Sequence, residues 1–189
     1  MKVKSLVMAC LMGLASVQGM AQAETLKIGV GAMFPPFESK DATGKLVGFD
    51  IELGDAVCAK MNVTCEWVET SFDGLIPALN ARKFDFINSA MNITEPRLKV
   101  IDFTVPIYNV PSQLVVKKGE TLDVTAETLK AKGVTVGVLQ GSAQESFARK
   151  HWQPKGVKVT SYANQEQIYA DLSSGRIQTA LQKTPSAID

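Results

Sequence analysis

The chain has 189 residues, 46% hydrophobic and 21% charged, a composition that excludes disordered, collagen-like and coiled-coil proteins. The length suits one or two compact units. Its formal net charge is +1, and Lys2 and Lys4 supply two of the 20 basic side chains. A near-neutral chain without a basic tract is a poor nucleic-acid binder, because phosphate neutralisation needs clustered Lys and Arg. The single histidine, His151, leaves little room for histidine-based metal or triad chemistry. We therefore expect no cofactor, no metal and no nucleic-acid partner.

The first 23 residues have the pattern of a signal peptide. Lys2 and Lys4 precede an apolar run at residues 6–17, and Ala21-Gln22-Ala23 matches the small-x-small cleavage pattern. The run is too short for a stable membrane span. A buried N-terminal helix is the alternative. We expect cleavage near Glu24 and a soluble, exported product.

Two cysteines remain after such cleavage, Cys58 and Cys65. An oxidising compartment favours their pairing as a disulfide. Cys58 is expected near the end of a helix and Cys65 inside a strand, so the bridge would join a helix to the next strand. Zinc is a weaker alternative, because a structural zinc needs four ligands.

Strands and helices are expected to alternate along the whole chain. In the first half we predict strands at 26–31, 63–67 and 84–87, a Phe-Pro-Pro-Phe loop at 34–37, a polar turn at 41–44, and helices capped by Asp50, Asp73 and Thr94. In the second half we predict strands at 134–139, 157–160 and 177–181, a helix opened by Gly141-Ser142, and a helix that begins at Asn164 or Gln165 and is ended by Gly175. This alternation predicts parallel sheets built from βαβ units.

A proline-containing segment separates the halves, and residues 114–116 are expected to run extended as a crossing between two lobes. Ligands of such sheets bind beyond the carboxyl ends of the strands. The residues expected there, facing one cleft, are those at 31–37, Phe72, 89–97 and 139–144.

Four stretches then carry a family resemblance: GFDIELG at 48–54, SFDGLIPAL at 71–79, NITEPR at 92–97 and VLQGS at 138–142. In this order they resemble the extracellular solute-binding proteins of family 3, in particular the branch that binds lysine, arginine, ornithine or histidine for ABC importers. The Cys58/Cys65 spacing fits a disulfide of that branch. The resemblance spans residues 26–181 and implies a type II periplasmic binding protein-like α/β fold, with two doubly wound lobes joined by a hinge. We expect a signal peptide at 1–23, lobe 1 at 24–108, the hinge crossing at 109–114 and lobe 2 at 115–189.

The resemblance also implies the ligand-binding residues. Arg97 would hold the ligand α-carboxylate, because a guanidinium presents a planar fork to a carboxylate. Phe34 and Phe72 would sandwich the ligand side chain. The alternative for Arg97 is a solvated arginine on a helix, and the alternative for the two phenylalanines is plain core packing. The other implied ligand-binding residues are Ser89, Ala90, Asn92, Gly141, Ser142 and Ala143.

Some positions depart from that branch. Gly31 stands where the branch has an acidic contact to a cationic side chain, and Phe34, Ala90 and Ala143 each lack a hydroxyl of the family pattern. Lys183 stands where an aspartate pairs with the ligand α-ammonium. Either the ligand differs, as an opine or another amino-acid derivative would, or Lys183 swings out to solvent.

The leading hypothesis is a periplasmic binding protein without catalytic activity. It would capture an amino acid or derivative as a monomer and present it to an inner-membrane ABC permease. The first alternative is an enzyme resembling the cyclohexadienyl (arogenate/prephenate) dehydratases of the same fold. It is disfavoured because the expected cleft residues include no acid apart from Glu95. The second alternative is a truncated product that binds nothing, since the family's C-terminal return segment is missing after residue 181.

Overall fold

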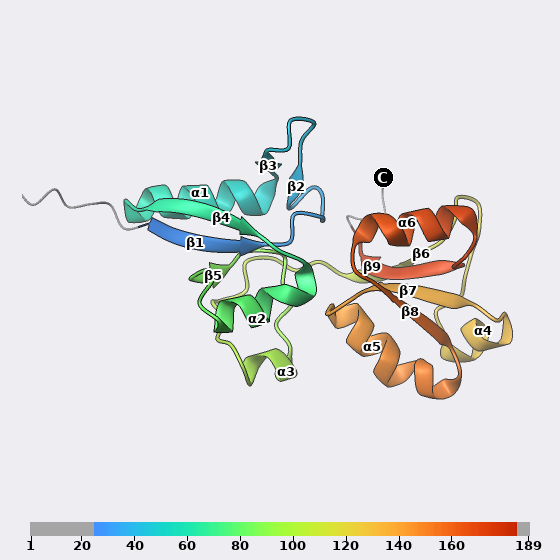
Figure 1. The fold of residues 1–189 in the computed structure, drawn as a ribbon. Coiled ribbons are helices and arrows are strands. Elements are labelled where there is room, and N and C mark those ends of the chain that lie inside the picture. The colour runs from blue at the N-terminus through green and yellow to red at the C-terminus, as the bar shows by residue number, and fades with distance from the viewer. Residues whose placement is uncertain (1–24, 185–189) are drawn as a thin grey trace, which may run out of the picture.

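The computed structural model describes residues 25–184, so the predicted signal peptide at 1–23 lies outside the described residues. Two sheets, each with helices on both faces, lie side by side and are joined near the middle of the molecule (Figure 1). We refer to the elements from β1 to α3 as the N-terminal half and to those from β6 to β9 as the C-terminal half. Within residues 25–184, no helix has the length and apolar character needed to cross a bilayer.

The N-terminal half is built on a three-stranded parallel sheet in the order β4-β1-β5. Its strands are β1 (Thr25–Val30), β4 (Thr64–Glu69) and β5 (Phe86–Ile87). Its helices are α1 (Phe49–Met61), the 3-10 turn η1 (Phe72–Gly74), α2 (Leu75–Asn80) and α3 (Glu95–Leu98). A small hairpin, β2 (Ser39–Lys40) with β3 (Leu46–Val47), contains the predicted polar turn.

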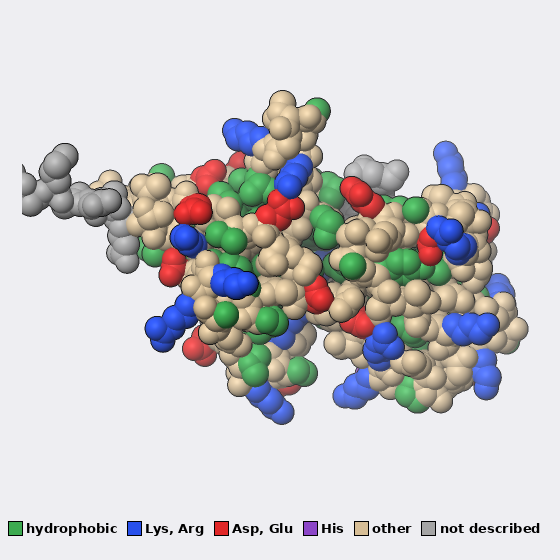
Figure 2. All heavy atoms as spheres, viewed as in Figure 1, with side chains coloured by type: hydrophobic (Ala, Val, Ile, Leu, Met, Phe, Trp, Pro, Cys, Tyr) green, Lys and Arg blue, Asp and Glu red, His purple; other side chains and the backbone are tan. Residues whose placement is uncertain are grey.

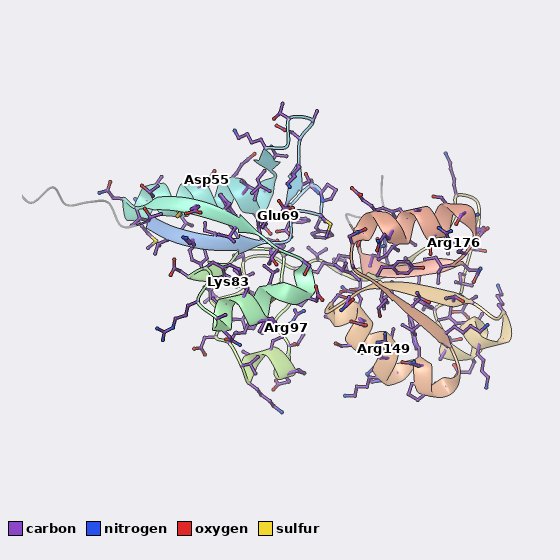
Figure 3. The ribbon with its side chains drawn as sticks, viewed as in Figure 1. Asp55, Glu69, Lys83, Arg97, Arg149 and Arg176 are labelled. Carbon is purple, nitrogen blue, oxygen red and sulfur yellow. A yellow bond between two sulfur atoms is a disulfide. The ribbon has the colours of Figure 1, made fainter. Side chains whose placement is uncertain are left out.

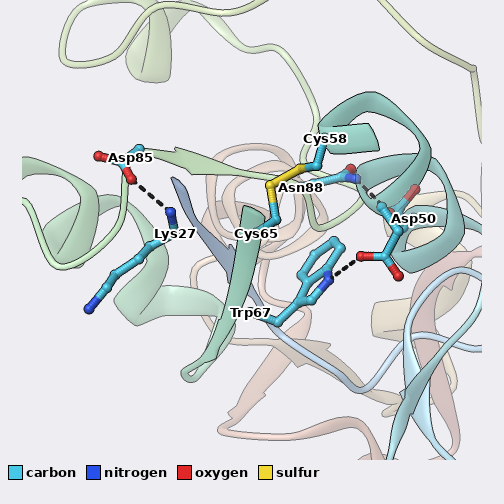
Figure 4. The surroundings of a disulfide bond; sticks show 8 residues. Lys27, Asp50, Cys58, Cys65, Trp67, Asp85 and Asn88 are labelled. Carbon is cyan, nitrogen blue, oxygen red and sulfur yellow. Dashed lines mark hydrogen bonds between the residues drawn. A yellow bond between two sulfur atoms is a disulfide. The ribbon is translucent and has the colours of Figure 1, made fainter. Parts of the chain in front are cut away.

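A disulfide between Cys58 and Cys65 joins the last turns of α1 to β4, as predicted (Figure 4). Nearby, the indole N–H of Trp67 on β4 donates a 2.9 Å hydrogen bond to Asp55 of α1. The helix and the strand are thus fixed to each other by one covalent and one polar contact.

Helix starts in this half differ from the predicted caps. Asp50 lies inside α1, which follows Gly48, and its carboxylate is buried and bonded elsewhere. Asp73 lies within the 3-10 turn η1, and α2 begins at Leu75, the residue that directly follows this turn. Thr94 occupies the N-cap of α3, as predicted, although its side chain makes no capping hydrogen bond.

The C-terminal half has a four-stranded sheet in the order β6-β9-β7-β8. Its strands are β6 (Ser112–Val115), β7 (Thr135–Leu139), β8 (Lys158–Tyr162) and β9 (Thr179–Lys183). Its helices are α4 (Ala126–Ala131), α5 (Ala143–His151), the 3-10 turn η2 (Gln153–Lys155) and α6 (Gln165–Ser174). The predicted caps are confirmed, because Ser142 and Asn164 accept from Glu145 and Gln167. Gly175 ends α6 with a φ of 81°.

The segment between the halves corrects one prediction. Residues 112–115 run extended, as predicted for the crossing, but they form β6, which pairs antiparallel with β9, so the second sheet is mixed rather than parallel. The amide of Thr184 continues this pairing by donating to the carbonyl of Pro111 at 2.9 Å. The end of β9 is therefore held beside the point where the chain enters the second sheet.

Apolar burial stabilises each sheet separately. Ile28, Val30 and Leu75 are fully buried in the N-terminal half. One cluster in the C-terminal half packs β7 against α4 and α5, and a second packs α6 against the sheet. On the face shown in Figure 2, Lys and Arg side chains are interspersed with Asp and Glu over both halves. This mixed surface agrees with the near-neutral net charge of the chain.

Candidate ligand-binding site

A cavity lies between the two halves and is lined from both. From the N-terminal half it is lined by Gly31, Met33, Phe34, Glu38, Phe72, Ser89, Ala90 and Asn92. From the C-terminal half it is lined by Leu139, Ser142, Gln144, Gln165, Leu181, Gln182 and Lys183. Most of these residues follow the carboxyl ends of β1, β5 and β7 or form the carboxyl end of β9, the edge at which ligands of open α/β sheets bind.

Six of the nine predicted ligand-binding residues line this cavity: Phe34, Phe72, Ser89, Ala90, Asn92 and Ser142. Arg97, Gly141 and Ala143 stand beside it and do not line it. Arg97 and Gly141 are nevertheless in direct contact with each other.

Arg97, from the short helix α3, is 9% exposed and lies close to α2 (Figure 3). Its guanidinium donates to the carbonyl of Asn92 at 2.7 Å and, across the two halves, to the carbonyl of Gly141 at 2.9 Å. It also lies 5.6 Å from the centroid of the Phe72 ring, a cation–π contact. Burial lowers the pKa of Arg97. A guanidinium has five N–H donors, so the two carbonyls leave some for a carboxylate.

Phe34 follows β1 at the start of the Phe-Pro-Pro-Phe loop. Its ring stacks on Phe37 with centroids 5.2 Å apart, and the Lys183 ammonium lies 5.6 Å from its centroid. Phe34 and Phe72 thus both line the cavity, and each ring lies near a cationic side chain of the protein.

Glu38 is an acid in the cavity to which no sequence motif points, and the expectation of a cleft without an acid other than Glu95 was wrong. The Phe-Pro-Pro-Phe loop folds back on itself through backbone hydrogen bonds between Phe34 and Glu38 at 2.7 and 3.0 Å, which bring Glu38 against β1 and β5. The hydroxyl of Ser89 donates to Glu38 Oε1 at 2.6 Å. The other oxygen, Oε2, is buried and has no hydrogen-bond partner among the described residues. Burial raises the pKa of Glu38 to about 8, so its carboxyl group is mainly protonated at neutral pH.

Asp50 is the second buried acid of this region. Its carboxylate accepts from the hydroxyl of Tyr108 at 2.8 Å and from the amide of Ala90 at 2.8 Å. Ala90 has a φ of 44°, a left-handed conformation that is costly for alanine. The buried carboxylate thus helps to hold the Ala90 turn, whose carbonyl faces the C-terminal half.

Lys183, at the end of β9, points into the cavity and does not swing out to solvent. Its ammonium donates to the carbonyl of Ala90 in the N-terminal half. Burial, followed by the charge of Arg97, lowers the pKa of Lys183 to about 8. One cation from each half therefore crosses to a backbone carbonyl of the other half.

The start of α5 provides the remaining predicted contacts. Ser142 lines the cavity and caps the helix, and Ala143 is the first helical residue. The amide of Gly141 donates to Glu145 Oε2 at 2.7 Å, so it is already occupied. Gly141 has a φ of 73°, and an added Cβ would lie 2.8 Å from the Cα of Asp73 in the N-terminal half. The two halves are in close contact here, and only glycine fits without displacement.

The chain belongs to the bacterial extracellular solute-binding proteins, family 3, whose profile matches residues 26–183. It is 44% identical over 189 residues to the lysine/arginine/ornithine-binding periplasmic protein of Escherichia coli K12, covering 99% of this chain and 72% of that protein. It is 46% identical over 164 residues to the histidine-binding periplasmic protein of the same organism, covering 87% and 62% of the two chains. A solved ancestral arginine-binding protein bound to arginine superposes with a TM-score of 0.80 at 41% identity, covering 86% of this chain and 71% of that one.

These similarities confirm the predicted family, the two-lobed type II periplasmic binding protein fold and a location in the periplasm. The relatives named here are binding proteins. The chain spans between 62% and 72% of the length of these two curated relatives.

Proposed function

We propose that this protein is the substrate-binding component of an ABC importer and that it holds an amino acid or an amino-acid derivative in the cavity between its halves. The observation that carries the proposal is a cavity lined from both halves, with two aromatic rings at its wall and a buried arginine packed on one of those rings. The names of the relatives support an amino-acid ligand. The proposed partner is an inner-membrane permease, and the proposed state is a monomer.

In this proposal the ligand replaces contacts that the two halves now make with each other. Arg97 takes a ligand carboxylate with the donors that Asn92 and Gly141 leave unused. Ser89, Asn92 and Ser142 offer polar groups, and Ala90 forms part of the wall. Gly141 and Ala143 flank Ser142 at the start of α5. Phe34 and Phe72 contact the apolar or cationic part of the ligand. Closure about the crossing at residues 109–114 traps the ligand between lobe 1 (24–108) and lobe 2 (115–189).

The direct test is isothermal titration with single amino acids and their derivatives, repeated on a matched pair of variants. Phe72→Leu keeps an apolar side chain but removes the ring from the cavity wall, and we expect it to weaken binding at least fivefold. Phe147→Leu changes a half-exposed ring on α5 outside the cavity and should leave the affinity unchanged. Equal effects of the two substitutions would contradict this placement of the ligand.

One observation favours a second candidate, a dehydratase-like enzyme. A general acid must be protonated at the working pH, and burial gives Glu38 that property inside the cavity. Incubation with prephenate and arogenate, followed by chromatography of the products, separates the candidates. A binding protein without catalytic activity leaves the rate of product formation at its uncatalysed value. Turnover that disappears in Glu38→Gln would establish the enzyme instead.

A further inference from the structure

Resting on this proposed function, we infer that the ligand carries a second carboxylate, which binds at the cavity wall formed by Gln182 and Lys183. The first carboxylate is the one assigned to Arg97. The site would therefore select an amino-acid derivative with two carboxylates over a simple amino acid. Three features of the described residues support this assignment.

The first feature is the fixed orientation of the Gln182 amide. Gln182 is 4% exposed and lines the cavity. Gln165 donates to the hydroxyl of Tyr169 at 3.1 Å, and that hydroxyl donates to Gln182 Oε1 at 3.2 Å. Since the amide oxygen is used, the amide nitrogen Nε2 is the free end, and it is buried without a hydrogen-bond partner among the described residues. Nε2 can only donate, so the group that completes it must be an acceptor.

The second feature is the neighbouring ammonium of Lys183. It has three N–H donors and no acceptor, and one donor is directed at the carbonyl of Ala90. The others are available to a group in the cavity. Gln182 and Lys183 together thus present donors and a positive charge, and a carboxylate satisfies both requirements.

The third feature is that neither of the two buried acids described in this region, Glu38 and Asp50, offers a free anion to a ligand ammonium. Asp50 is engaged by Tyr108 and by the Ala90 amide, and Glu38 Oε1 is engaged by Ser89. The remaining oxygen of Glu38 belongs to a carboxyl group that is mainly protonated at neutral pH. A ligand ammonium beside Lys183 would meet like charge at short range, whereas a carboxylate there would be attracted.

The test compares ligands that differ by one carboxylate. L-arginine and N²-(1-carboxyethyl)-L-arginine form one pair, and L-glutamine and L-glutamate form a second. Isothermal titration at pH 7 should show the dicarboxylate of at least one pair binding at least tenfold more tightly than its partner. Tighter binding of the monocarboxylate in both pairs, or equal binding, would overturn the inference and leave the proposed function intact. If none of these ligands and no other amino acid binds, the proposed function fails, and the inference fails with it.

Variants then locate the second carboxylate. Lys183→Met should lower the preference for the dicarboxylate, expressed as the ratio of the two dissociation constants, at least tenfold. Lys183→Asp should reverse the preference. Lys150→Met removes an exposed positive charge from α5 in the same half and should change neither affinity by more than twofold. Gln182→Leu provides a second measurement if a Lys183 variant unfolds, and it should also reduce the preference. A preference that survives both Lys183→Met and Gln182→Leu would place the second carboxylate elsewhere and overturn the assignment.

Discussion

The guanidinium of Arg97 donates a 2.9 Å hydrogen bond to the carbonyl of Gly141, which links α3 of the N-terminal half to the loop before α5. In the opposite direction, Lys183 donates to the carbonyl of Ala90. These reciprocal contacts hold the halves together around the cavity. A ligand carboxylate at Arg97 would therefore bind at the point where the two halves meet.

Arg97→Lys keeps the charge but removes the fork that serves a carbonyl and a carboxylate together. We expect the dissociation constant for the ligand to rise about tenfold to a hundredfold, as the loss of a bidentate charged contact implies. Isothermal titration measures the change. Arg82→Lys is the matched control, because Arg82 is exposed and outside the cavity. An unchanged affinity in Arg97→Lys would show that Arg97 does not hold the ligand carboxylate.

Glu38 should make the stability of the protein depend on pH in a window where most carboxyl groups do not titrate. Burial raises its pKa from 4.5 to about 8, so the unfolded chain releases this proton at a lower pH than the folded protein. Its contribution is fully present below pH 4.5 and is lost as the pH rises through about 8. The free energy of unfolding should fall by up to about 1.4 kcal/mol per pH unit across this window.

Chemical denaturation at several pH values between 5 and 8 tests this slope. Glu38→Gln keeps a polar group for Ser89 and removes this ionisation, so its slope should be clearly shallower; burial also raises the pKa of Asp50, which accounts for part of the remaining slope. Lys183, with its pKa lowered to about 8, contributes mainly above that pH and does not mask the effect. Parallel slopes for the two proteins would contradict a raised pKa of Glu38.

Tyr108→Phe removes one of the donors to the buried carboxylate of Asp50. We expect the free energy of unfolding to fall by about 2 kcal/mol, the cost of leaving a buried acceptor without that donor. Tyr162→Phe is the comparison, because Tyr162 donates at 2.7 Å to Asp171, which also pairs with Arg176 near the surface. Its loss should be smaller. Urea titration of both variants checks the order, and the reverse order would contradict the role given to Asp50.

The disulfide closes a short loop, with a sequence separation of 7 between Cys58 and Cys65. The double variant Cys58→Ala/Cys65→Ala should lose about 2 kcal/mol of unfolding free energy, since a small loop restricts the unfolded chain only modestly. Urea titration with and without a reducing agent measures the change. The wild-type protein should respond to the reducing agent and the double variant should not.

Local sequence patterns predicted the framework of the fold well. The apolar strand at 134–139, the cap at Asn164 and the glycine at 175 are signals within a few residues of the structure they specify, and the structure has them. The pairing of β6 with β9 was not predictable in this way, because it joins residues 112–115 to residues 180–183. Asp50 looked like a helix cap for the same reason: its partners Ala90 and Tyr108 are distant in sequence.

The candidate site was predicted less completely. Phe34 and Arg97 could be named from motifs, but Glu38 enters the cavity only because the loop before it folds back through Phe34. Gln182 acquires its free amide nitrogen only through Tyr169, which lies on α6. A family motif names positions, whereas which atoms remain without a partner depends on tertiary contacts.

A thermal unfolding scan against amino acids, their N-carboxyalkyl derivatives and small dicarboxylates shows whether the cavity binds a small amino acid or derivative. A ligand at 100 times its dissociation constant adds about 2.7 kcal/mol to the stability of the folded protein. We expect a cooperative transition whose midpoint rises with one chemical class of ligand and not with the others. A cooperative transition that no member of the set moves at millimolar concentration would contradict this expectation.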